Sequence, residues 1–131
     1  MRYFLIERQL ERSLKILWVE NHAEFARLAA RQFLRGHTVT VVPSLAAARA
    51  VLTVSRFDVL LVDFDLDDGK GTELVRSMQE QPQRPPIVAT SSHEQGNRAL
   101  LEAGADAACS KLAFAEIRNV IKRVIEEGRA N

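Results

Sequence analysis

The sequence of 131 residues holds a single cysteine, Cys109. One thiol cannot form a disulfide within the chain, and it cannot supply a metal site built from several thiolates. The composition therefore excludes a small secreted domain stapled by disulfides. A lone cysteine is typical of a reducing compartment such as the cytoplasm.

Neither sign of charge predominates, because 18 Lys and Arg residues stand against 17 Asp and Glu residues and the formal net charge is +1. This balance gives no electrostatic reason to expect a nucleic acid as a partner. Long apolar runs are also lacking, since the N-terminal segment MRYFLIERQLERS is continuously apolar only from Tyr3 to Ile6. A signal peptide needs a longer run, and a membrane span needs about 20 apolar residues. We therefore expect a cytoplasmic protein without a membrane contact.

The chain has the size and composition of one globular domain. With 47% apolar and 27% charged residues it is too apolar for disorder, and 131 residues are too few for two domains. We expect the domain over residues 14–127, an N-terminal extension of undefined role over 1–13 and a short tail over 128–131. The tail is too short to hold an output domain, so none is expected.

Five short apolar segments alternate with five helical patterns along the chain. Strands are predicted over residues 14–19, 38–42, 57–63, 87–90 and 107–110. Helices are predicted over residues 23–35, from the capping Ser44 onward, and over 71–79, 95–103 and 114–127. Leu28 is among the apolar residues at helical spacing in the first of them. Five βα units in succession predict an α/β fold, a doubly wound parallel five-stranded sheet with right-handed crossovers.

Polar residues follow four of the predicted strands at their carboxyl ends. They are Glu20 and Asn21, then Asp63 with Asp65, Asp67 and Asp68, then Ser91 and Ser92, and finally Lys111. Ligand chemistry in such a sheet collects at this edge. A carboxylate there can attack phosphorus, neighbouring acids can hold Mg²⁺, and a hydroxyl and a lysine can bind phosphoryl oxygens.

Four segments that carry these residues together resemble the receiver domain of bacterial response regulators in two-component signalling. They are KILWVEN (15–21), DVLLVDFDLDDGKG (58–71), PIVATSS (86–92) and EAGADAACSK (102–111), in the family's order and spacing. The resemblance implies a flavodoxin-like fold with strand order 2-1-3-4-5. It also implies a phosphorelay protein that is not an enzyme beyond accepting and losing a phosphoryl group. A histidine kinase or phosphotransfer protein would be the donor and another protein the downstream target, and a homodimer is compatible with the family.

Carried over by position, the resemblance makes Asp63 the phospho-acceptor. Lys111 matches the lysine that pairs with the phosphoryl group, and Ser91 matches the hydroxyl that turns toward it on activation. The same residue types allow plainer roles, since Ser91 also suits a turn and Lys111 a surface ion pair.

For the metal, Glu20 and Asn21 match the acidic pair that holds Mg²⁺ together with Asp63. Asp65 matches the residue whose backbone carbonyl binds the ion. Asn21 departs from the usual acid, so one formal charge is missing and Mg²⁺ is expected to bind weakly. The acids at 65, 67 and 68 either offset this loss or form a solvated turn.

Two further departures support a second hypothesis, a pseudo-receiver that binds proteins independently of phosphorylation. Ala108 stands where an aromatic residue is usual, and Leu112 replaces the proline after Lys111. The family's cis bond would cost about 2.5–4 kcal/mol between Lys111 and Leu112, so a trans bond with a shifted Lys111 is expected.

A third hypothesis comes from DFDLD (63–67), which resembles the nucleophile motif of haloacid dehalogenase phosphatases with Asp65 as general acid. That family has the motif near the start of a longer chain and Thr or Val at position 67, so the hypothesis ranks last.

Other distinctive residues are interpreted as structural. We expect Trp18 and Cys109 in the core. His22, His37 and His93 occur singly, and we expect them on the surface or in loops rather than as ligands.

Overall fold

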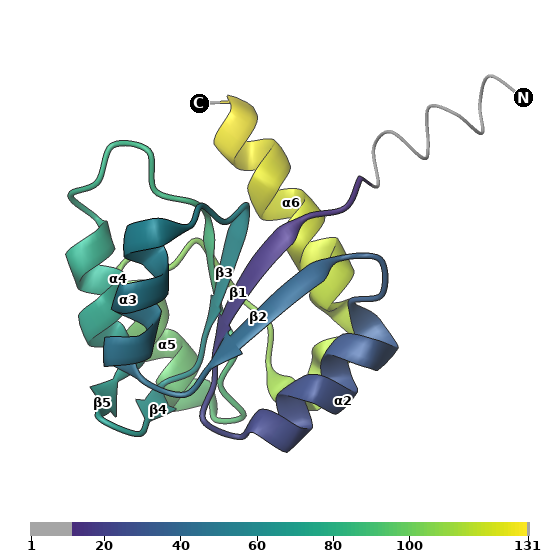
Figure 1. Cartoon of the computed structure of the whole chain (residues 1–131), viewed down its shortest axis with the longest axis horizontal. Coiled ribbons are helices and arrows are strands. Elements are labelled where there is room, and N and C mark those ends of the chain that lie inside the picture. The colour runs from purple at the N-terminus through teal and green to yellow at the C-terminus, as the bar shows by residue number, and fades with distance from the viewer. Residues whose placement is uncertain (1–11, 131) are drawn as a thin grey trace, which may run out of the picture.

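Five parallel strands form one sheet in the order β2-β1-β3-β6-β7, which confirms the predicted topology (Figure 1). In chain order they are β1 (Lys15–Val19), β2 (Thr38–Val42), β3 (Val59–Val62), β6 (Ile87–Ala89) and β7 (Ala107–Ala108). The computed structural model describes residues 12–130. Residues 1–11 of the predicted N-terminal extension therefore lie outside the described residues.

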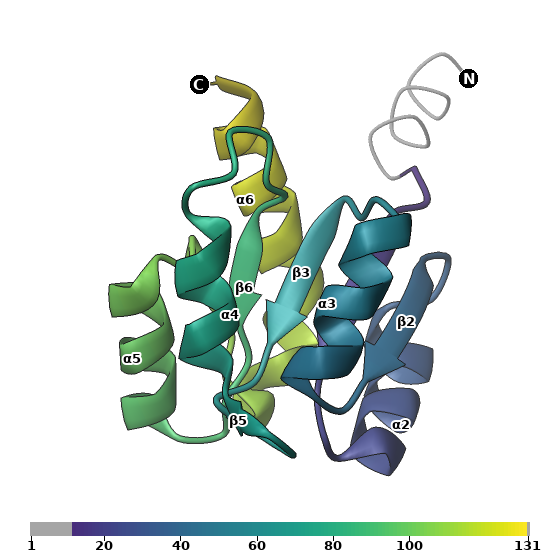
Figure 2. The same ribbon diagram turned by 60° about the vertical axis from the view of Figure 1, so that its left-hand side comes forward.

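The sheet lies between two layers of helices (Figure 2). One face is covered by α3 (Leu45–Val54), α4 (Gly71–Met78) and α5 (Glu94–Ala103), and the other by α2 (Ala23–Phe33) and α6 (Ile117–Ala130). This arrangement leaves the carboxyl ends of the strands open at one edge, where the predicted site residues lie.

The alternation of side chains along β1 supplies both apolar cores. Ile16 and Trp18 pack with α2 and α6, whereas Leu17 and Val19 pack with α3, α4 and α5. Successive residues of a strand point to opposite faces, so a strand covered on both sides is apolar throughout. All four side chains are fully buried.

Trp18 is a core residue, as predicted. Its ring stacks on Phe114 with centroids 4.9 Å apart, and Phe25 meets it edge-on at 5.9 Å. Cys109 is also buried, and burial raises the pKa of its thiol.

Several predicted boundaries are wrong in detail. Strand β3 starts at Val59 rather than at residue 57, and β7 has two residues rather than four. The final helix α6 starts at Ile117 and continues to Ala130, so it takes in most of the predicted tail. A 3₁₀ helix (Lys111–Glu116) precedes it, and within that segment the backbone of Ala113 is not helical (φ −124°, ψ 36°).

The sequence did not predict the hairpin after β3, which consists of β4 (Asp65–Leu66) and β5 (Gly69–Lys70). Leu28, one of the apolar residues at helical spacing in α2, is 59% exposed. The buried positions of α2 are Ala26 and Ala29, whose small side chains let the helix lie close to the sheet.

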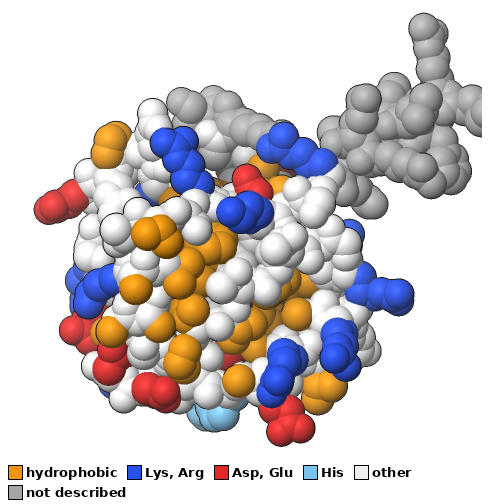
Figure 3. Space-filling model, viewed as in Figure 1, with side chains coloured by type: hydrophobic (Ala, Val, Ile, Leu, Met, Phe, Trp, Pro, Cys, Tyr) orange, Lys and Arg blue, Asp and Glu red, His pale blue; other side chains and the backbone are white. Residues whose placement is uncertain are grey.

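Apolar side chains gather on one outer face, over α3 and toward the edge strand β2, with Lys and Arg around them (Figure 3). Val54, at the end of α3, is 81% exposed. Within residues 12–130, no helix combines the length and hydropathy that crossing a membrane would require.

Candidate functional site

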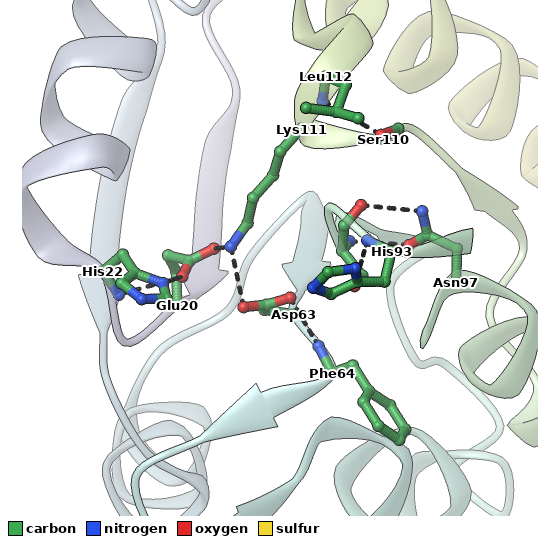
Figure 4. A network of polar contacts seen from close by, with 10 residues as sticks. Glu20, His22, Asp63, Phe64, His93, Asn97, Ser110, Lys111 and Leu112 are labelled. Atoms are coloured by element: carbon green, nitrogen blue, oxygen red, sulfur yellow. Dashed lines mark hydrogen bonds and ion pairs between the residues drawn. The ribbon is translucent and has the colours of Figure 1, made fainter. Parts of the chain in front are cut away.

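Asp63, Glu20 and Lys111 meet at the carboxyl ends of the central strands (Figure 4). Lys111 Nζ lies 2.9 Å from Asp63 Oδ2 and 2.7 Å from Glu20 Oε1. The Glu20 side chain is fully buried, and those of Asp63 and Lys111 are 7% and 10% exposed. One ammonium group therefore bridges two buried carboxylates.

The register of the sheet explains this meeting of residues that are far apart in sequence. Val19 pairs with Val62, so the residues that follow them, Glu20 and Asp63, leave neighbouring strands side by side. Asp63 N–H donates to Val19 O at 3.0 Å. Lys111 N–H donates to Ser91 O at 3.3 Å, which holds the start of the 3₁₀ helix (Lys111–Glu116) beside the loop after β6.

Burial and neighbouring charges both affect the ionisation of Glu20 in this cluster. Burial raises the pKa of the Glu20 carboxyl above its ordinary value of 4.5, and the neighbouring Asp63 carboxylate acts in the same direction. The hydrogen bonds from the Lys111 ammonium and from the His22 backbone N–H oppose the shift. Two carboxylates and one ammonium leave the cluster with one net negative charge when all are ionised.

His22 belongs to this cluster, although the sequence suggested a surface histidine without a ligand role. Its side chain is 70% exposed, as expected, but its Nδ1 lies 3.2 Å from Glu20 Oε2. Its backbone N–H donates to the same oxygen at 3.0 Å. The only sequence signal for this contact is the spacing of two residues from Glu20.

The residues present fit a divalent cation. Glu20, His22 and Asp63 each offer a ligand atom, and these atoms lie within 4.8 Å of one another. Asn21 Oδ1 is buried, and no hydrogen-bond partner for it exists among residues 12–130. A buried carbonyl oxygen without a donor is suited to coordinate a cation.

The acid run after β3 is mostly engaged elsewhere. Asp65 forms an ion pair with Lys70, and its side chain is 63% exposed. Asp68 accepts hydrogen bonds from Leu45 N and Ala46 N at 2.7 and 3.0 Å, at the start of α3. The side chains of two of the three acids therefore have partners outside the cluster.

Ser91 is buried at the end of β6, close to the site. Its hydroxyl accepts a hydrogen bond from His93 N at 3.1 Å, the turn geometry that the sequence also allowed. Within the described residues, no hydrogen bond joins Ser91 to Asp63. A Cβ atom on Gly96 would lie 2.6 Å from Ser91 Oγ, so the glycine leaves room for the hydroxyl.

Asn97 is a buried residue of this region that the sequence did not suggest. Its Oδ1 accepts from Ser91 N at 2.8 Å, and its Nδ2 donates to Ser91 O at 3.0 Å. The amide thus holds the backbone of the loop that carries the predicted hydroxyl.

Leu112 and Ala108, the two departures from the family pattern near Lys111, lie on either side of it in the chain. The Lys111–Leu112 bond is trans, as predicted, and so are all other peptide bonds of residues 12–130. Lys111 Nζ reaches Asp63 from this trans backbone. The Leu112 side chain is 85% exposed, and Ala108 is a small, half-buried residue on β7.

Comparisons with known proteins agree with this geometry. The sequence matches the family model described as a response regulator receiver domain over residues 16–122. The TorCAD operon transcriptional regulatory protein TorR of Escherichia coli K12 is 32% identical over 100 residues, which are 76% of this chain and 43% of that protein. The chain therefore matches less than half the length of that curated relative.

Solved structures give the same result. The receiver domain of sensor histidine kinase PA1611 from Pseudomonas aeruginosa PAO1, with a magnesium ion coordinated in its active-site cleft, has a TM-score of 0.73 and 28% identity, covering 87% of this chain and 98% of that one. A CheY-like response regulator receiver domain protein from Methanospirillum hungatei JF-1 has a TM-score of 0.77 at 21% identity, with 90% and 98% coverage. At that identity the second likeness shows the fold alone.

Proposed function

The chain belongs to the response regulator receiver domain family, and we propose that its Asp63 accepts a phosphoryl group from a histidine kinase or phosphotransfer protein. The observation that supports this role is the contact of 2.9 Å between Lys111 Nζ and Asp63 Oδ2 at the end of the central strand. An ammonium group in this place can bind the oxygens of a phosphoryl group attached to the carboxylate. We also propose that the protein works in the cytoplasm and is not itself an enzyme.

The transfer breaks a phosphorus–nitrogen bond in the donor's phosphohistidine and forms a phosphorus–oxygen bond to Asp63. The electron pair of the broken bond stays on the donor nitrogen, and the Asp63 carboxylate is the nucleophile. A bound Mg²⁺ would supply charge stabilisation for the phosphoryl oxygens. Glu20, Asn21 and the backbone carbonyl of Asp65 are the residues proposed to hold it, together with Asp63.

Lys111 has to change partners in this process. It is now shared between Asp63 and Glu20, and the acyl phosphate would offer it a more strongly charged acceptor. Ser91 would have to release the His93 N–H before its hydroxyl could turn toward the new group. A change at the end of β6 is therefore expected to accompany phosphorylation.

The output proposed for this change is a protein-binding surface on α5 and β7. Leu101 on α5 is 43% exposed, and the β7 residues Ala107 and Ala108 are only half-buried. Because Ala108 has no ring to rotate, the signal would pass through the Ser91 loop rather than through an aromatic side chain.

An amide NMR titration with Mg²⁺ and then beryllofluoride, a phosphoryl mimic, tests the proposal. We expect saturable shifts at Asp63, Ser91 and Lys111 in the wild type and none in Asp63→Asn. Asp67→Asn is the matched control, because this exposed acid in the same loop should leave the response intact. A flat response at saturating Mg²⁺ would overturn phosphoryl acceptance.

The alternative, binding of a partner independently of phosphorylation, is favoured by Asn21, Ala108 and Leu112. Partner capture with wild type and Asp63→Ala separates the two functions. An interaction module should bind its partner equally well with either protein. A phosphorylation-dependent regulator should bind its partner differently before and after phosphorylation, and Asp63→Ala should abolish that difference. The phosphatase hypothesis gains no support, because Asp65 is exposed and paired with Lys70.

A further inference from the structure

The contact between His22 Nδ1 and Glu20 Oε2 is the least expected feature of the site, because it adds a nitrogen to a cluster of oxygens. We propose that His22 is a metal ligand here, and that the site therefore prefers a first-row transition ion such as Zn²⁺ or Co²⁺ over Mg²⁺. Because this ion would occupy the site described above, the inference rests on the proposed function and specifies its metal.

The geometry of the two side chains suits a shared ion. Ligands about 2.0–2.1 Å from one metal, at tetrahedral to octahedral angles, lie about 2.8–3.4 Å from each other. The observed separation of Nδ1 and Oε2 is 3.2 Å. The same distance also suits a hydrogen bond, so the test has to distinguish coordination from a simple polar contact.

Asp63 completes the set with a small adjustment. The candidate ligand atoms of Glu20, His22 and Asp63 lie within 4.8 Å of one another. Ligand atoms on opposite sides of an octahedral ion are about 4.2 Å apart. Two atoms separated by 4.8 Å would therefore have to approach each other by about 0.6 Å, which side-chain rotation can supply. Asn21 Oδ1, buried and without a donor in the described chain, offers a further oxygen nearby in sequence.

The charges of the site disfavour Mg²⁺ and favour the softer ions. Lys111 neutralises one of the two carboxylates, and Asn21 adds no charge. Mg²⁺ depends on charged oxygen ligands and gives up its water reluctantly. An imidazole instead binds Zn²⁺, Co²⁺ and Ni²⁺ well without adding charge.

The position of His22 makes this role available to it. The residue precedes α2, and its side chain makes no capping hydrogen bond to that helix. Because the side chain is 70% exposed, its ring can reorient without disturbing the core. Replacement of His22 should therefore leave the fold intact, which circular dichroism can verify.

The test is a titration of the full chain with Co²⁺ and Zn²⁺ in the absence of any phosphoryl donor, followed by visible absorption and by ¹⁵N NMR of the imidazole rings. We expect the His22 ring nitrogens to shift on binding and the wild type to prefer Zn²⁺ over Mg²⁺ by at least about tenfold. Loss of a residue that only hydrogen-bonds to a metal ligand weakens metal binding about 10–100-fold, so His22→Ala and His22→Gln should weaken Zn²⁺ binding at least as much. Both variants should weaken the binding of Mg²⁺ less than the binding of Zn²⁺.

His93→Ala is the matched control, since this exposed histidine precedes α5 in the way that His22 precedes α2. It should bind Zn²⁺ as the wild type does, whereas Asp63→Asn should weaken that binding. Unchanged Zn²⁺ binding in His22→Ala, or equal affinities of the wild type for Mg²⁺ and Zn²⁺, would overturn the inference.

A protein that coordinates Co²⁺ through His22 but does not respond to beryllofluoride retains this metal site and loses the proposed function. The opposite pair of results retains phosphoryl acceptance and removes His22 from the site.

Discussion

The side-chain amide of Asn97 pairs with the backbone of Ser91 through two hydrogen bonds, from Ser91 N at 2.8 Å and to Ser91 O at 3.0 Å. Both residues are buried, with 8% and 3% of their surfaces exposed. The pair fixes the loop after β6 at the point where it passes the phospho-acceptor candidate. Asn97 is thus a residue on which the position of the Ser91 hydroxyl depends.

Replacing Asn97 with Ala should destabilise the fold. The change leaves the buried N–H of Ser91 without a partner and removes one of the two hydrogen bonds to Ser91 O, which costs about 1–3 kcal/mol. Urea unfolding measures the loss. Asn119→Ala is the control, because Asn119 is exposed on α6 and its bond to Glu116 is on the surface. Equal stability of the two variants would mean that water or a rearranged loop replaces the Asn97 bonds.

Replacing Lys111 with Met should destabilise the protein most at neutral pH. The variant leaves Glu20 and Asp63 buried without their ammonium, and hydrogen bonds to charged groups are worth about 1.5–3 kcal/mol. The loss should shrink in acid, where protonated carboxylates need no counter-charge. Unfolding curves of Lys111→Met and of Lys122→Met, an exposed lysine on α6, provide the comparison. An equal loss of stability at neutral and at acid pH would contradict this electrostatic explanation.

The Asp68 carboxylate should make a pH-dependent contribution to stability. The N–H groups of Leu45 and Ala46 hold the pKa of Asp68 below its ordinary value of 3.8. The folded protein thus binds this proton less tightly than the unfolded chain does. The contribution is complete above pH 3.8 and is lost as the pH falls through the lowered pKa.

Asp68→Asn should therefore be less stable than wild type at neutral pH, and the difference should diminish on acidification below pH 3.8. Chemical unfolding across that range measures it. Asp67→Asn, a change of the exposed neighbouring acid, should show no such trend. A constant difference between Asp68→Asn and wild type would show that the carboxylate charge is not responsible.

Gly71 is required by a close approach between α4 and the end of β3. A Cβ atom there would lie 2.0 Å from Asp63 O and 2.8 Å from Val62 Cγ1. Gly71→Ala should cost about 1–3 kcal/mol of stability and displace Asp63. Gly128→Ala should instead gain up to about 1 kcal/mol, because the added methyl on α6 meets nothing within 4 Å. Thermal unfolding of both variants checks the opposite signs, and a stabilised Gly71→Ala would refute the close approach.

The sheet and the Asp63–Lys111–Glu20 cluster could be predicted because they depend on local patterns. Apolar strands and helical periodicity specify the order of elements, and parallel pairing then brings the strand ends together. The roles of Ser91, Asn21 and Asp65 were carried over from the family resemblance by their positions at the strand ends. These roles stay proposals, as does the binding of Mg²⁺.

The missed features depend on contacts that sequence spacing does not encode. Asp68 is 23 residues from Leu45, and their hydrogen bond exists only once the loop after β3 lies beside α3. Asn97 looked like an ordinary polar residue of an amphipathic helix until the fold placed it against Ser91. Helical spacing alone also did not reveal that Ala26 and Ala29 form the buried face of α2 and that Leu28 is exposed.

The bonds from Asp68 to α3 also have a mechanical consequence. Asp67 N–H donates to Pro43 O at 3.3 Å, so the loop that follows Asp63 is fastened both to the linker after β2 and to the first turn of α3. A rearrangement of that loop would therefore change its hydrogen bonds to this turn. The amide protons of Leu45 and Ala46 would then exchange with solvent at a rate set by the state of the loop. The exchange of these amide protons in the first turn of α3 would therefore report on changes at the acceptor site.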